Sequence, residues 1–361
     1  NRFVSYLLRQ GAAVRVYSPT VDTPAFEPAG DLVSAPSFAV PGRKEYRVPY
    51  RLSGALRRDL KQFGPNLVHV SSPDPLGHRA VSWARAHGLP TVASVHTRFE
   101  TYPRYYGLAF LEPLIESMLR RFYRRCDAIV APSESMAQLL REQRMSYDVG
   151  IWTRGIDREI FCPARRDLAW RRALGIGDDV PVIGFIGRLV MEKGLDVFAE
   201  AIVQLHQRQV PHKVLVIGDG PAREWFEKAL PGGIFAGFKT GKDLGEALAS
   251  GDIFFNPSIT ETFGNVTLEA MACGLPVVAA GATGAASLVQ DGATGRLVPP
   301  DRPEVFAPAC AEALAPYCTD DNLRLLHGAN GEEAAGAYTW DAINQAVVET
   351  YLRLIAGRRG S

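Results

Sequence analysis

Two carboxylates that could bind hydroxyl groups lie eight residues apart in the segment PSITETFGNVTLE, residues 257–269. Glu261 falls in the expected loop, and Glu269 falls about one turn into the helix that follows. The segment comes directly after the apolar run 253–256, which we expect to be a strand. Ligands bind at the carboxyl ends of strands in open α/β sheets, so this position favours a binding site. On spacing alone an alternative stays open, in which Glu269 merely favours the first turns of its helix and Glu261 is a solvated loop residue.

The start of that helix could bind an anion. Gly264, Asn265 and Val266 open it, and the first N–H groups of a helix have no partner within the helix. A phosphate at this point would lie between the two carboxylates, each of which can accept hydrogen bonds from a sugar or a ribose. The pattern therefore indicates a ligand that carries both phosphate and hydroxyl groups.

Two cations follow another buried run in the segment GRLVMEKG, residues 187–194. Arg188 and Lys193 leave the end of an expected strand, 181–186, and enter a Lys-Gly turn before a helix. Arginine offers a two-pronged donor and lysine a compact charge, which together suit a diphosphate. Read alone, the segment could equally be a solvated turn with an ion pair to Glu192. The two segments should lie at neighbouring strand ends of one sheet, so together they favour a nucleoside diphosphate.

A third group of polar and aromatic residues, HTRFETYPRYYG, spans residues 96–107. His96 lies just past the expected strand 91–95, in a loop that should face the cleft between two domains. Aromatic and arginine side chains after a strand end commonly contact sugars, but a structural histidine with exposed aromatics is an open alternative. The arginines and tyrosines of this group include Arg98, Tyr102, Arg104 and Tyr105.

Several other patterns carry little signal. Gly218-Asp219-Gly220 lacks the third glycine of a dinucleotide fingerprint. No Ser-His-Asp order, HExxH or Walker A sequence appears, and the five cysteines form no CxxC pair and lie near no histidine at zinc-ligand spacing. We expect reduced core thiols in a cytosolic protein and no metal. The remaining histidines, which we expect to be structural, are His69, His78, His87, His206, His212 and His327.

Short apolar runs alternate with helical patterns along the whole chain. In the first half we expect strands at 12–17, 67–70, 91–95 and 128–131, and helices at 3–8, 80–86, 114–125 and 136–144. In the second half we expect strands at 181–186, 213–217, 253–256 and 276–280, and helices at 195–207, 243–250 and 266–273. This alternation indicates an α/β protein with two doubly wound parallel sheets. The expected domains are 1–150 and 151–339, followed by a final helix within 340–361.

Composition agrees with two domains and shows an uneven charge. The chain has 361 residues, of which 47% are hydrophobic, and no stretch approaches the roughly 20 apolar residues that span a bilayer. Residues 1–150 hold 20 Lys/Arg and 13 Asp/Glu, a net charge of +7, whereas the whole chain carries +1. A basic first half suggests an anionic partner, either a membrane surface, an acidic substrate or nucleic acid.

The expected helix 114–125 could supply a membrane contact. It carries Arg120, Arg121, Arg124 and Arg125 on one broad face, beside Leu119 and Phe122. We expect weak, salt-sensitive binding to anionic lipid, with a solvated helix as the alternative.

The stretch NPSITETFGNVTLEAMACGLPVVAA, residues 256–280, resembles the signature of retaining glycosyltransferases of family 4, which have the GT-B fold of two Rossmann-like domains facing a cleft. Glu261 and Glu269 match the E-x7-E motif of that family, and Arg188 and Lys193 match its diphosphate-binding pair. The segments RGIDREIFCP and GFKTGKDL are also similar to it. Within the family the likeness is greatest to bacterial α-mannosyltransferases and sulfoquinovosyltransferases that build glycolipids.

The resemblance implies a role for each matching residue. Arg188 and Lys193 would bind the donor diphosphate and stabilise the leaving group, and Glu269 would hold the ribose. Glu261 and the amides of residues 264–266 would hold the donor sugar and distal phosphate, and His96 would contact that sugar from the opposite domain. The implied catalytic set is His96, Arg188, Lys193 and Glu261, and the implied acceptor-side set is Arg98, Tyr102, Arg104 and Tyr105. The implied donor-binding set is Gly187, Arg188, Lys193, Phe238, Lys239, Glu261, Phe263, Gly264, Asn265, Val266 and Glu269, with the loop at 238–239 bordering the base.

The implied reaction moves a mannose- or glucose-type sugar from a GDP- or UDP-linked donor to an acceptor hydroxyl of a lipid or glycan. It keeps the anomeric configuration and needs no cofactor, because Arg188 and Lys193 would replace a divalent cation. The implied partners are the nucleotide sugar and an anionic membrane surface, without nucleic acid, for a cytoplasmic protein that is peripheral on the inner face of the membrane. Two alternatives stay open, a sugar-nucleotide epimerase and a non-catalytic sugar-nucleotide-binding protein.

The start of the sequence departs from the family pattern. The family begins with a strand and a glycine-rich loop before its first helix, whereas here a helical pattern already starts at residue 3. We therefore expect this chain to bind nucleotide but to transfer sugar poorly. The final helix is expected to cross back onto the first domain.

Overall fold

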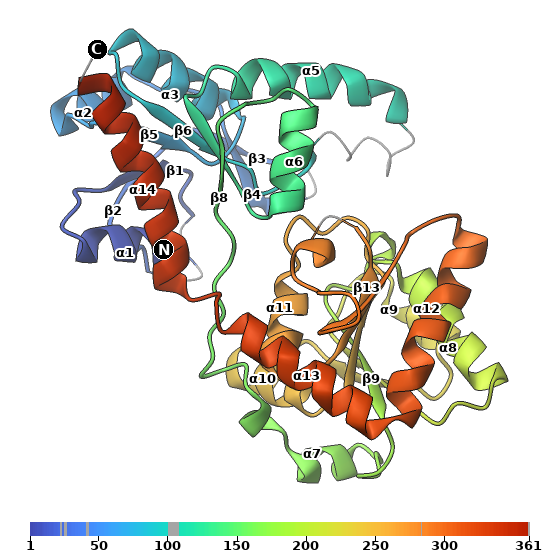
Figure 1. The fold of residues 1–361 in the computed structure, drawn as a ribbon. Helices are drawn as coiled ribbons and strands as arrows, with labels where there is room; N and C mark the ends of the chain where they lie inside the picture. Colours follow the sequence, from blue (N-terminus) through green and yellow to red (C-terminus); the bar gives the residue numbers. More distant parts are fainter. Residues whose placement is uncertain (22–23, 25–26, 41–42, 100–107, 283, 360–361) are drawn as a thin grey trace. The chain divides into compact units, whose positions relative to one another are not determined.

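The computed structural model describes residues 1–361 apart from 22–23, 25–26, 41–42, 100–107, 283 and 360–361. Contacts divide the chain into two compact units (Figure 1). Unit 1 consists of Asn1–Thr153 and Trp340–Ser361, and unit 2 consists of Arg154–Thr339. The chain therefore leaves unit 1 once, builds all of unit 2, and returns to unit 1 for its last helix.

Unit 2 is built on one six-stranded parallel sheet with helices on both faces. Its strands are β9 (Val182–Ile186), β10 (Lys213–Ile217), β11 (Ile234–Gly237), β12 (Ile253–Asn256), β13 (Val277–Ala280) and β14 (Gly295–Val298). Its helices are α7 (Leu168–Ala173), α8 (Leu195–Gln207), α9 (Arg223–Ala229), α10 (Gly241–Ala249), α11 (Asn265–Ala272), α12 (Pro303–Thr319) and α13 (Asp321–Ala335). Three short 3-10 turns complete it, η3 (Pro163–Arg165), η4 (Met191–Lys193) and η5 (Ala285–Ser287).

Side chains of the central strand alternate between two cores, one on each face of this sheet. Ile183 and Phe185 belong to the core that α8 and α12 cover, whereas Val182 and Ile186 belong to the core that α10 and α11 cover. All five residues of β9 are buried. A strand that is apolar on both faces is stable only when helices cover both faces of its sheet. The continuous apolar sequence of β9 predicts this arrangement.

The strand order in unit 2 is β11-β10-β9-β12-β13-β14, and every pair is parallel. From β9 the chain first builds outward through β10 and β11, then returns to place β12 on the other side of β9. The order therefore reverses between β9 and β12. In open α/β sheets the connections at such a reversal diverge and leave a crevice at the carboxyl ends of the two strands.

Unit 1 is also α/β, with two parallel sheets and one antiparallel hairpin. Its strands are β1 (Arg15–Ser18), β2 (Asp31–Ser34), β3 (Ser37–Val40), β4 (Arg43–Pro49), β5 (Val68–Val70), β6 (Thr91–Ser94), β7 (Ala128–Ala131) and β8 (Val149–Ile151). Its helices are α1 (Arg2–Arg9), α2 (Gly54–Phe63), α3 (Pro75–Ala86), α5 (Glu112–Tyr123), α6 (Glu134–Glu142) and α14 (Trp340–Arg359), with a 3-10 turn η2 (Ala109–Leu111). The sheets are β1-β2, β5-β6-β7-β8 and the hairpin β3-β4. The expected parallel, doubly wound character is confirmed, but the hairpin was not predicted.

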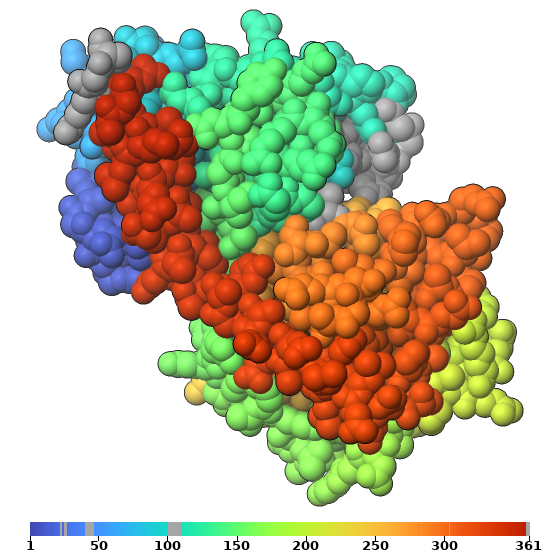
Figure 2. Space-filling model, in the orientation of Figure 1, coloured from blue at the N-terminus to red at the C-terminus, as the bar shows by residue number. Residues whose placement is uncertain are grey.

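Helix α14 packs on unit 1 beside α1, where its red ribbon and atoms lie along the unit in Figures 1 and 2. Arg353 makes a two-pronged contact of 2.7 and 2.9 Å with the carboxylate of Asp148. Arg358 donates at 2.8 Å to Asp127, which also accepts hydrogen bonds from Thr91. Ion pairs therefore anchor the last helix to loops at the ends of β7 and β8.

The two ends of unit 2 are joined to each other within that unit. The backbone N–H of Ile156 donates to the carbonyl of Tyr338 at 2.9 Å, and Arg158 pairs with Glu332 at 2.8 Å. Among the described residues, no helix of either unit is both long and apolar enough to cross a membrane.

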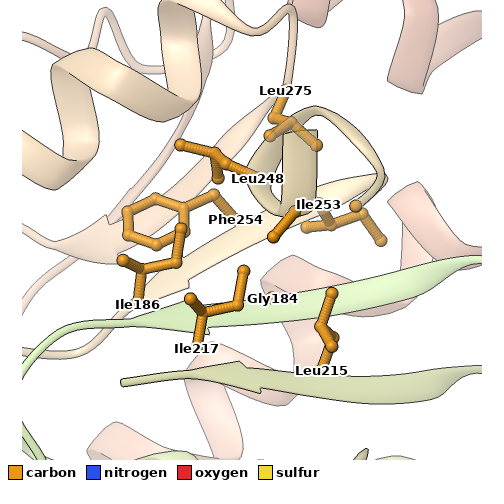
Figure 3. Close-up of a pocket in the computed structure, with 10 residues that line it drawn as sticks. Gly184, Ile186, Leu215, Ile217, Leu248, Ile253, Phe254 and Leu275 are labelled. Atoms are coloured by element: carbon orange, nitrogen blue, oxygen red, sulfur yellow. The ribbon is translucent and has the colours of Figure 1, made fainter. Parts of the chain in front are cut away.

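A small apolar cavity of about 10 Å³ lies between the central strands of unit 2 and helix α10 (Figure 3). The close-up shows Leu248 and Phe254 on one side of the cavity and Ile217 on the other, and Gly184 also lines it. A Cβ at Gly184 would meet only the backbone oxygen of Ile253 within 4 Å, at an ordinary contact distance of 3.6 Å. The cavity therefore has room for one methyl group at this position.

We predict that Gly184→Ala raises the free energy of unfolding by about 0.5–1 kcal/mol, since it fills the cavity and removes backbone entropy from the unfolded chain. Gly218→Ala is the contrasting control. Its φ is +143° and its Cβ would lie 1.9 Å from the carbonyl oxygen of Gly187, so we expect a loss of about 2 kcal/mol or more. Denaturant titration measures both variants, and a destabilised Gly184→Ala would contradict the cavity interpretation.

Candidate functional site

Charged residues from two neighbouring strand ends meet at the reversal point of the unit 2 sheet. Lys193 lies in η4, directly after β9, and Glu261 lies in the loop after β12. Nζ of Lys193 donates to Oε1 of Glu261 at 2.7 Å, with the side chains only 29% and 17% exposed. The sequence-based expectation that the two segments are neighbours is therefore correct. The lysine pairs with Glu261 and not with Glu192, the partner in the solvated-turn alternative.

Close backbone packing fixes the loop after β9 on one side. Gly218 and Gly220 lie in the loop after β10, and a Cβ on Gly220 would lie 2.4 Å from the carbonyl oxygen of Leu189. Three backbone hydrogen bonds reinforce the contact: Gly187 N to the Ile217 oxygen, Leu189 N to the Asp219 oxygen, and Ala222 N to the Leu189 oxygen, each at 3.0 Å. The Gly-Asp-Gly sequence therefore permits two loops to touch through their backbones, a role that does not require a dinucleotide fingerprint.

The loop after β12 holds the same segment on its other side. Gly194 has a φ of +73°, and a Cβ there would lie 3.0 Å from the carbonyl oxygen of Pro257. The hydroxyl of Thr260 donates to the carbonyl of Glu192 at 3.3 Å. Residues 187–194 are therefore packed between the loops after β10 and β12. This packing fixes the backbone that carries Arg188 and Lys193.

The N-terminus of α11 is open to a ligand. Gly264, the N-cap residue, has a left-handed conformation with φ 92°, and no side chain caps the helix. Asn256 at the end of β12 donates to the Thr267 hydroxyl at 3.2 Å and accepts from the Ser258 N–H at 3.2 Å. This buried asparagine, which sequence analysis did not single out, fixes the helix start relative to the preceding loop. The position resembles the anion sites common at helix N-termini.

Glu269 lies one turn further along α11, in poorly solvated surroundings. Burial raises the pKa of its carboxyl from 4.5 to about 7, because a charged carboxylate loses water and no hydrogen-bond donor among the described residues replaces it. A carboxyl in this state gains from any ligand that donates hydrogen bonds to its ionised form. Perturbed carboxyls of this kind are typical of binding sites, although structural groups can show the same shift.

The remaining predicted donor residues take different positions. Arg188 is exposed, and no hydrogen bond or ion pair holds its guanidinium among the described residues. Phe238, at the end of β11, is 74% exposed, and the Lys239 ammonium lies 5.6 Å from the ring centre of Trp170. Phe263 is only 4% exposed and packs against Tyr338. Its side chain therefore belongs to the core, and only its backbone is available to a ligand.

His96 belongs to unit 1 and follows β6. Its ring contacts Trp152 edge-on, with the ring centres 5.5 Å apart. Trp152 in turn contacts His69, whose Nδ1 is hydrogen-bonded to the Tyr351 hydroxyl of α14. Desolvation, helped by the nearby charge of His96, lowers the pKa of His69 to about 3. His69 is therefore a neutral structural residue, as expected, in a cluster of rings that includes His96.

The expected acceptor-side residues are only partly described. Arg98 is half-buried, whereas Tyr102, Arg104 and Tyr105 lie outside the described residues. No group of three or more metal-ligating side chains occurs in the described part of the chain. The roles assigned to these residues, and to the donor-binding set, stay predictions.

Family models match both units of the chain. The model described as Glycosyltransferase Family 4 matches residues 1–160, and the model described as Glycosyl transferases group 1 matches residues 180–315. The second match covers the loops after β9 and β12 and helix α11, and the first covers His96.

Similar proteins extend the match over nearly the whole chain. A GDP-mannose-dependent alpha-mannosyltransferase of Mycolicibacterium smegmatis is 31% identical over 99% of this chain and 93% of its own length. A sulfoquinovosyl transferase of Arabidopsis thaliana is 30% identical over 95% of this chain and 67% of its own length. The structure of sucrose-phosphate synthase from Thermosynechococcus elongatus covers 99% of this chain and 92% of its own, with a TM-score of 0.77 at 19% identity, which indicates a shared fold. The chain is therefore a glycosyltransferase that belongs to family 4 and has the GT-B fold.

Proposed function

We propose that this protein transfers a hexose from a nucleoside diphosphate sugar to an acceptor hydroxyl with the anomeric configuration kept. The observation that carries the proposal is the meeting of Lys193, Glu261 and the open N-terminus of α11 at the reversal point of one sheet. A diphosphate needs cations and free N–H groups, and a sugar needs a carboxylate that accepts from its hydroxyls.

Stabilisation of the departing diphosphate is the main catalytic contribution in this proposal. When the glycosidic bond breaks, negative charge grows on the diphosphate, and preorganised cations lower the barrier most when they are aimed at that charge. The packed loop 187–194 holds Lys193 in place, and Arg188 of the same loop is exposed and available to a ligand. Glu261 accepts hydrogen bonds from the sugar, Glu269 from the ribose, and the loop at Phe238 borders the base.

The acceptor attacks on the same face of the sugar as the leaving group. Glu261 and Glu269 are assigned to binding, and among the described residues we identify no other carboxylate that would serve as an enzymic nucleophile. The departing phosphate oxygen takes the proton of the acceptor hydroxyl as the new bond forms. His96 contacts the donor sugar and helps to orient it. Replacement of His96 by alanine should therefore lower the turnover number with little effect on free nucleoside diphosphate binding.

A guanine nucleotide and a mannosyl group are the first donor to test, because a relative that is 31% identical is GDP-mannose-dependent by name. A thermal-shift screen compares GDP with UDP, and a turnover assay then compares GDP-mannose with UDP-glucose. Ligands that bind the native state raise the unfolding temperature by mass action, so the correct base gives the larger shift.

The acceptor in this proposal is a lipid or glycan hydroxyl, and unit 1 associates peripherally with an anionic membrane surface. The net charge of +7 over residues 1–150 supports this assignment. An epimerase or a non-catalytic binder would behave differently. Release of labelled sugar from the donor separates an enzyme from a binder, and dependence of that release on acceptor separates a transferase from an epimerase.

We predict that Arg188→Ala and Lys193→Ala each lower turnover about 100- to 1000-fold, because each removes a preorganised charge from the diphosphate. Lys242→Ala is the matched control, since Lys242 is an exposed lysine of unit 2 on α10, and its turnover should be unchanged. Circular dichroism checks that every variant is folded. Near-normal turnover in both folded variants would exclude the assigned role.

We predict that Glu269→Ala weakens binding of free nucleoside diphosphate about 10- to 100-fold, because the ribose loses hydrogen bonds to a charged acceptor. Glu261→Ala should instead leave that affinity nearly unchanged and lower the affinity for the intact donor, because Glu261 is assigned to the sugar. Titration calorimetry with both ligands separates the two effects. An equal loss of free nucleotide binding in both variants would contradict this division.

We predict that the affinity for the intact donor rises between pH 6 and pH 8. With a pKa of about 7, the Glu269 carboxyl is mostly protonated at the lower pH and ionised at the higher one. Because the ionised form accepts hydrogen bonds from the ribose, the gain should reach about tenfold. The donor has no terminal phosphate that titrates near pH 6. Calorimetry should show that Glu269→Gln removes this slope, and an equal slope in the variant would refute the assignment.

A further inference from the structure

Trp152 lies at the centre of an aromatic cluster in unit 1, directly after strand β8. Its ring contacts Phe3 of α1 with the ring centres 4.9 Å apart, His69 of β5 at 5.7 Å, and His96 at 5.5 Å. Tyr351 of α14 completes the cluster through its contacts with Phe3 and His69. Trp152 therefore connects His96, the histidine assigned to the donor sugar, to residues near both ends of the sequence.

The pairing of the unit 1 strands explains why these side chains meet. Residues that pair in a sheet share a face, and every second residue of a strand lies on that face again. The paired residues that share one face of the sheet β5-β6-β7-β8 are His69, Val92, Ala128, Val130 and Gly150. Trp152 comes two residues after Gly150, so its ring lies on the same face as the imidazole of His69.

Helix α14 covers this face and supports the tryptophan. It packs on β8 and on α1 (Figure 1). At Gly150 a Cβ would lie 3.4 Å from the hydroxyl oxygen of Thr350, so a side chain larger than that of alanine would push the helix away from the strand. The hydroxyl of Tyr351, on the same helix, is hydrogen-bonded to Nδ1 of His69. This bond fixes the imidazole against which Trp152 packs.

The main chains beside Trp152 and His96 are fixed on either side of β7. The N–H of Trp152 donates to the carbonyl of Ala131 at 2.7 Å, and the N–H of Val95 donates to the carbonyl of Val130 at 3.0 Å. These two bonds hold the chain after β8 and the chain after β6 at a constant spacing. His96 follows Val95 and is half-buried, so the direction of its ring depends on the side chains around it.

We propose that Trp152 is a positioning residue that holds the His96 ring in the direction needed for contact with the donor sugar. The inference rests on the proposed function, in which His96 orients that sugar. A side chain that orients a substrate must stay within about 0.5 Å and roughly 10–20° of its productive geometry. The edge-on contact with a tryptophan that is packed against α1 and β5 supplies this constraint.

Steady-state kinetics tests the proposal, with labelled GDP-mannose or UDP-glucose as donor and an alkyl mannoside as acceptor. Trp152→Leu should lower the turnover number about tenfold or more, because misplacement by about 1 Å can cost about 100-fold. Trp152→Phe keeps an aromatic ring on the same backbone and should restore most of the turnover. Neither variant should change the affinity for free GDP or UDP in calorimetry, because unit 2 carries the nucleotide contacts.

A double-mutant cycle separates positioning from general damage to the structure. If Trp152 acts through His96, its removal has little left to disturb in a chain that already carries His96→Ala. Trp152→Leu should then lower the turnover number less than about twofold in that background. An equal loss with and without His96 would overturn the proposal, and so would normal turnover of Trp152→Leu in the otherwise unaltered chain.

Trp83→Leu is the matched control. Trp83 lies in α3, and its ring stacks on His87 with the ring centres 4.1 Å apart, so the change again removes a tryptophan from a histidine of unit 1. His87 precedes β6, whereas His96 follows it, so the control pair lies at the opposite edge of the sheet. Its turnover should equal that of the unaltered chain, and a loss as large as that of Trp152→Leu would contradict the inference.

Thermal unfolding checks that all variants are folded. If Trp152→Leu does not fold, Trp152→Met takes its place in the kinetics and in the cycle. Methionine also removes the aromatic ring, but its flexible side chain fills more of the same space. The expected loss of turnover and its dependence on His96 are the same for both variants.

Nuclear magnetic resonance of histidine-labelled protein observes the ring itself and does not require turnover. His96→Ala identifies the His96 signal among those of the seven histidines. Relaxation should show an ordered imidazole in the unaltered chain and in Trp152→Phe, and a more mobile one in Trp152→Leu. An equally ordered ring in Trp152→Leu would overturn the inference. If the unaltered chain turns over neither donor, the proposed function fails, and these spectra alone decide whether Trp152 orders His96.

Discussion

The candidate site depends on one steric constraint, the contact of three loops through their backbones in unit 2. Gly218 and Gly220 allow the loop after β10 to touch residues 187–189, and Gly194 allows the turn after β9 to touch Pro257. Any Cβ at Gly218 would overlap the Gly187 carbonyl. The loop that carries Arg188 and Lys193 therefore has little freedom, although it lies at the surface. Rigid backbone is what a catalyst needs if its charges are to meet a transition state without reorganisation.

The constraint also decides which charges are neutralised before a ligand arrives. Lys193 is held within reach of Glu261, so these two opposite charges offset each other before a ligand binds. Arg188 points out of the same loop into solvent, and the N-terminus of α11 has no side-chain cap. The site thus combines the Lys193–Glu261 ion pair with two positive groups that no anion neutralises among the described residues, the Arg188 guanidinium and the N-terminus of α11. A diphosphate sugar carries the complementary set, two anionic phosphates next to neutral hydroxyls.

Strongly apolar elements could be predicted from sequence almost to the residue. The strands Lys213–Ile217, Ile253–Asn256 and Ala128–Ala131 and the helix Leu195–Gln207 have the expected bounds, because continuous burial or a clear helical period leaves no competing structure. The antiparallel pair of β3 and β4 was missed because charged residues interrupt the alternation of β4. In a parallel sheet the loops after neighbouring strands lie at the same edge. The proximity of the loops that carry Lys193 and Glu261 could therefore be predicted from the expected topology.

Features that depend on tertiary contact could not be predicted in this way. A glycine is needed at position 220 because the backbone of Leu189 packs against it, a contact that the sequence does not reveal. The burial of Phe263 depends on Tyr338, which is 75 residues away in the sequence. Helix α5 is the clearest case. Leu119 and Phe122 were expected to contribute to a membrane contact, but they are 8% and 1% exposed and belong to the core of unit 1. Periodicity alone does not say which apolar residues of the helix meet the sheet.

The return of α14 to unit 1 has a consequence for the order in which the protein can fold during synthesis. Unit 2 is continuous in sequence, and the hydrogen bond between Ile156 and Tyr338 joins its ends. A ribosome therefore completes it before releasing the helix that unit 1 still lacks. Until residues 340–359 emerge, Asp127 and Asp148 have no arginine from α14, and His69 has no hydroxyl from Tyr351. The first unit to be translated is thus the last to be finished, and its incomplete surface is the one that a chaperone would have to protect.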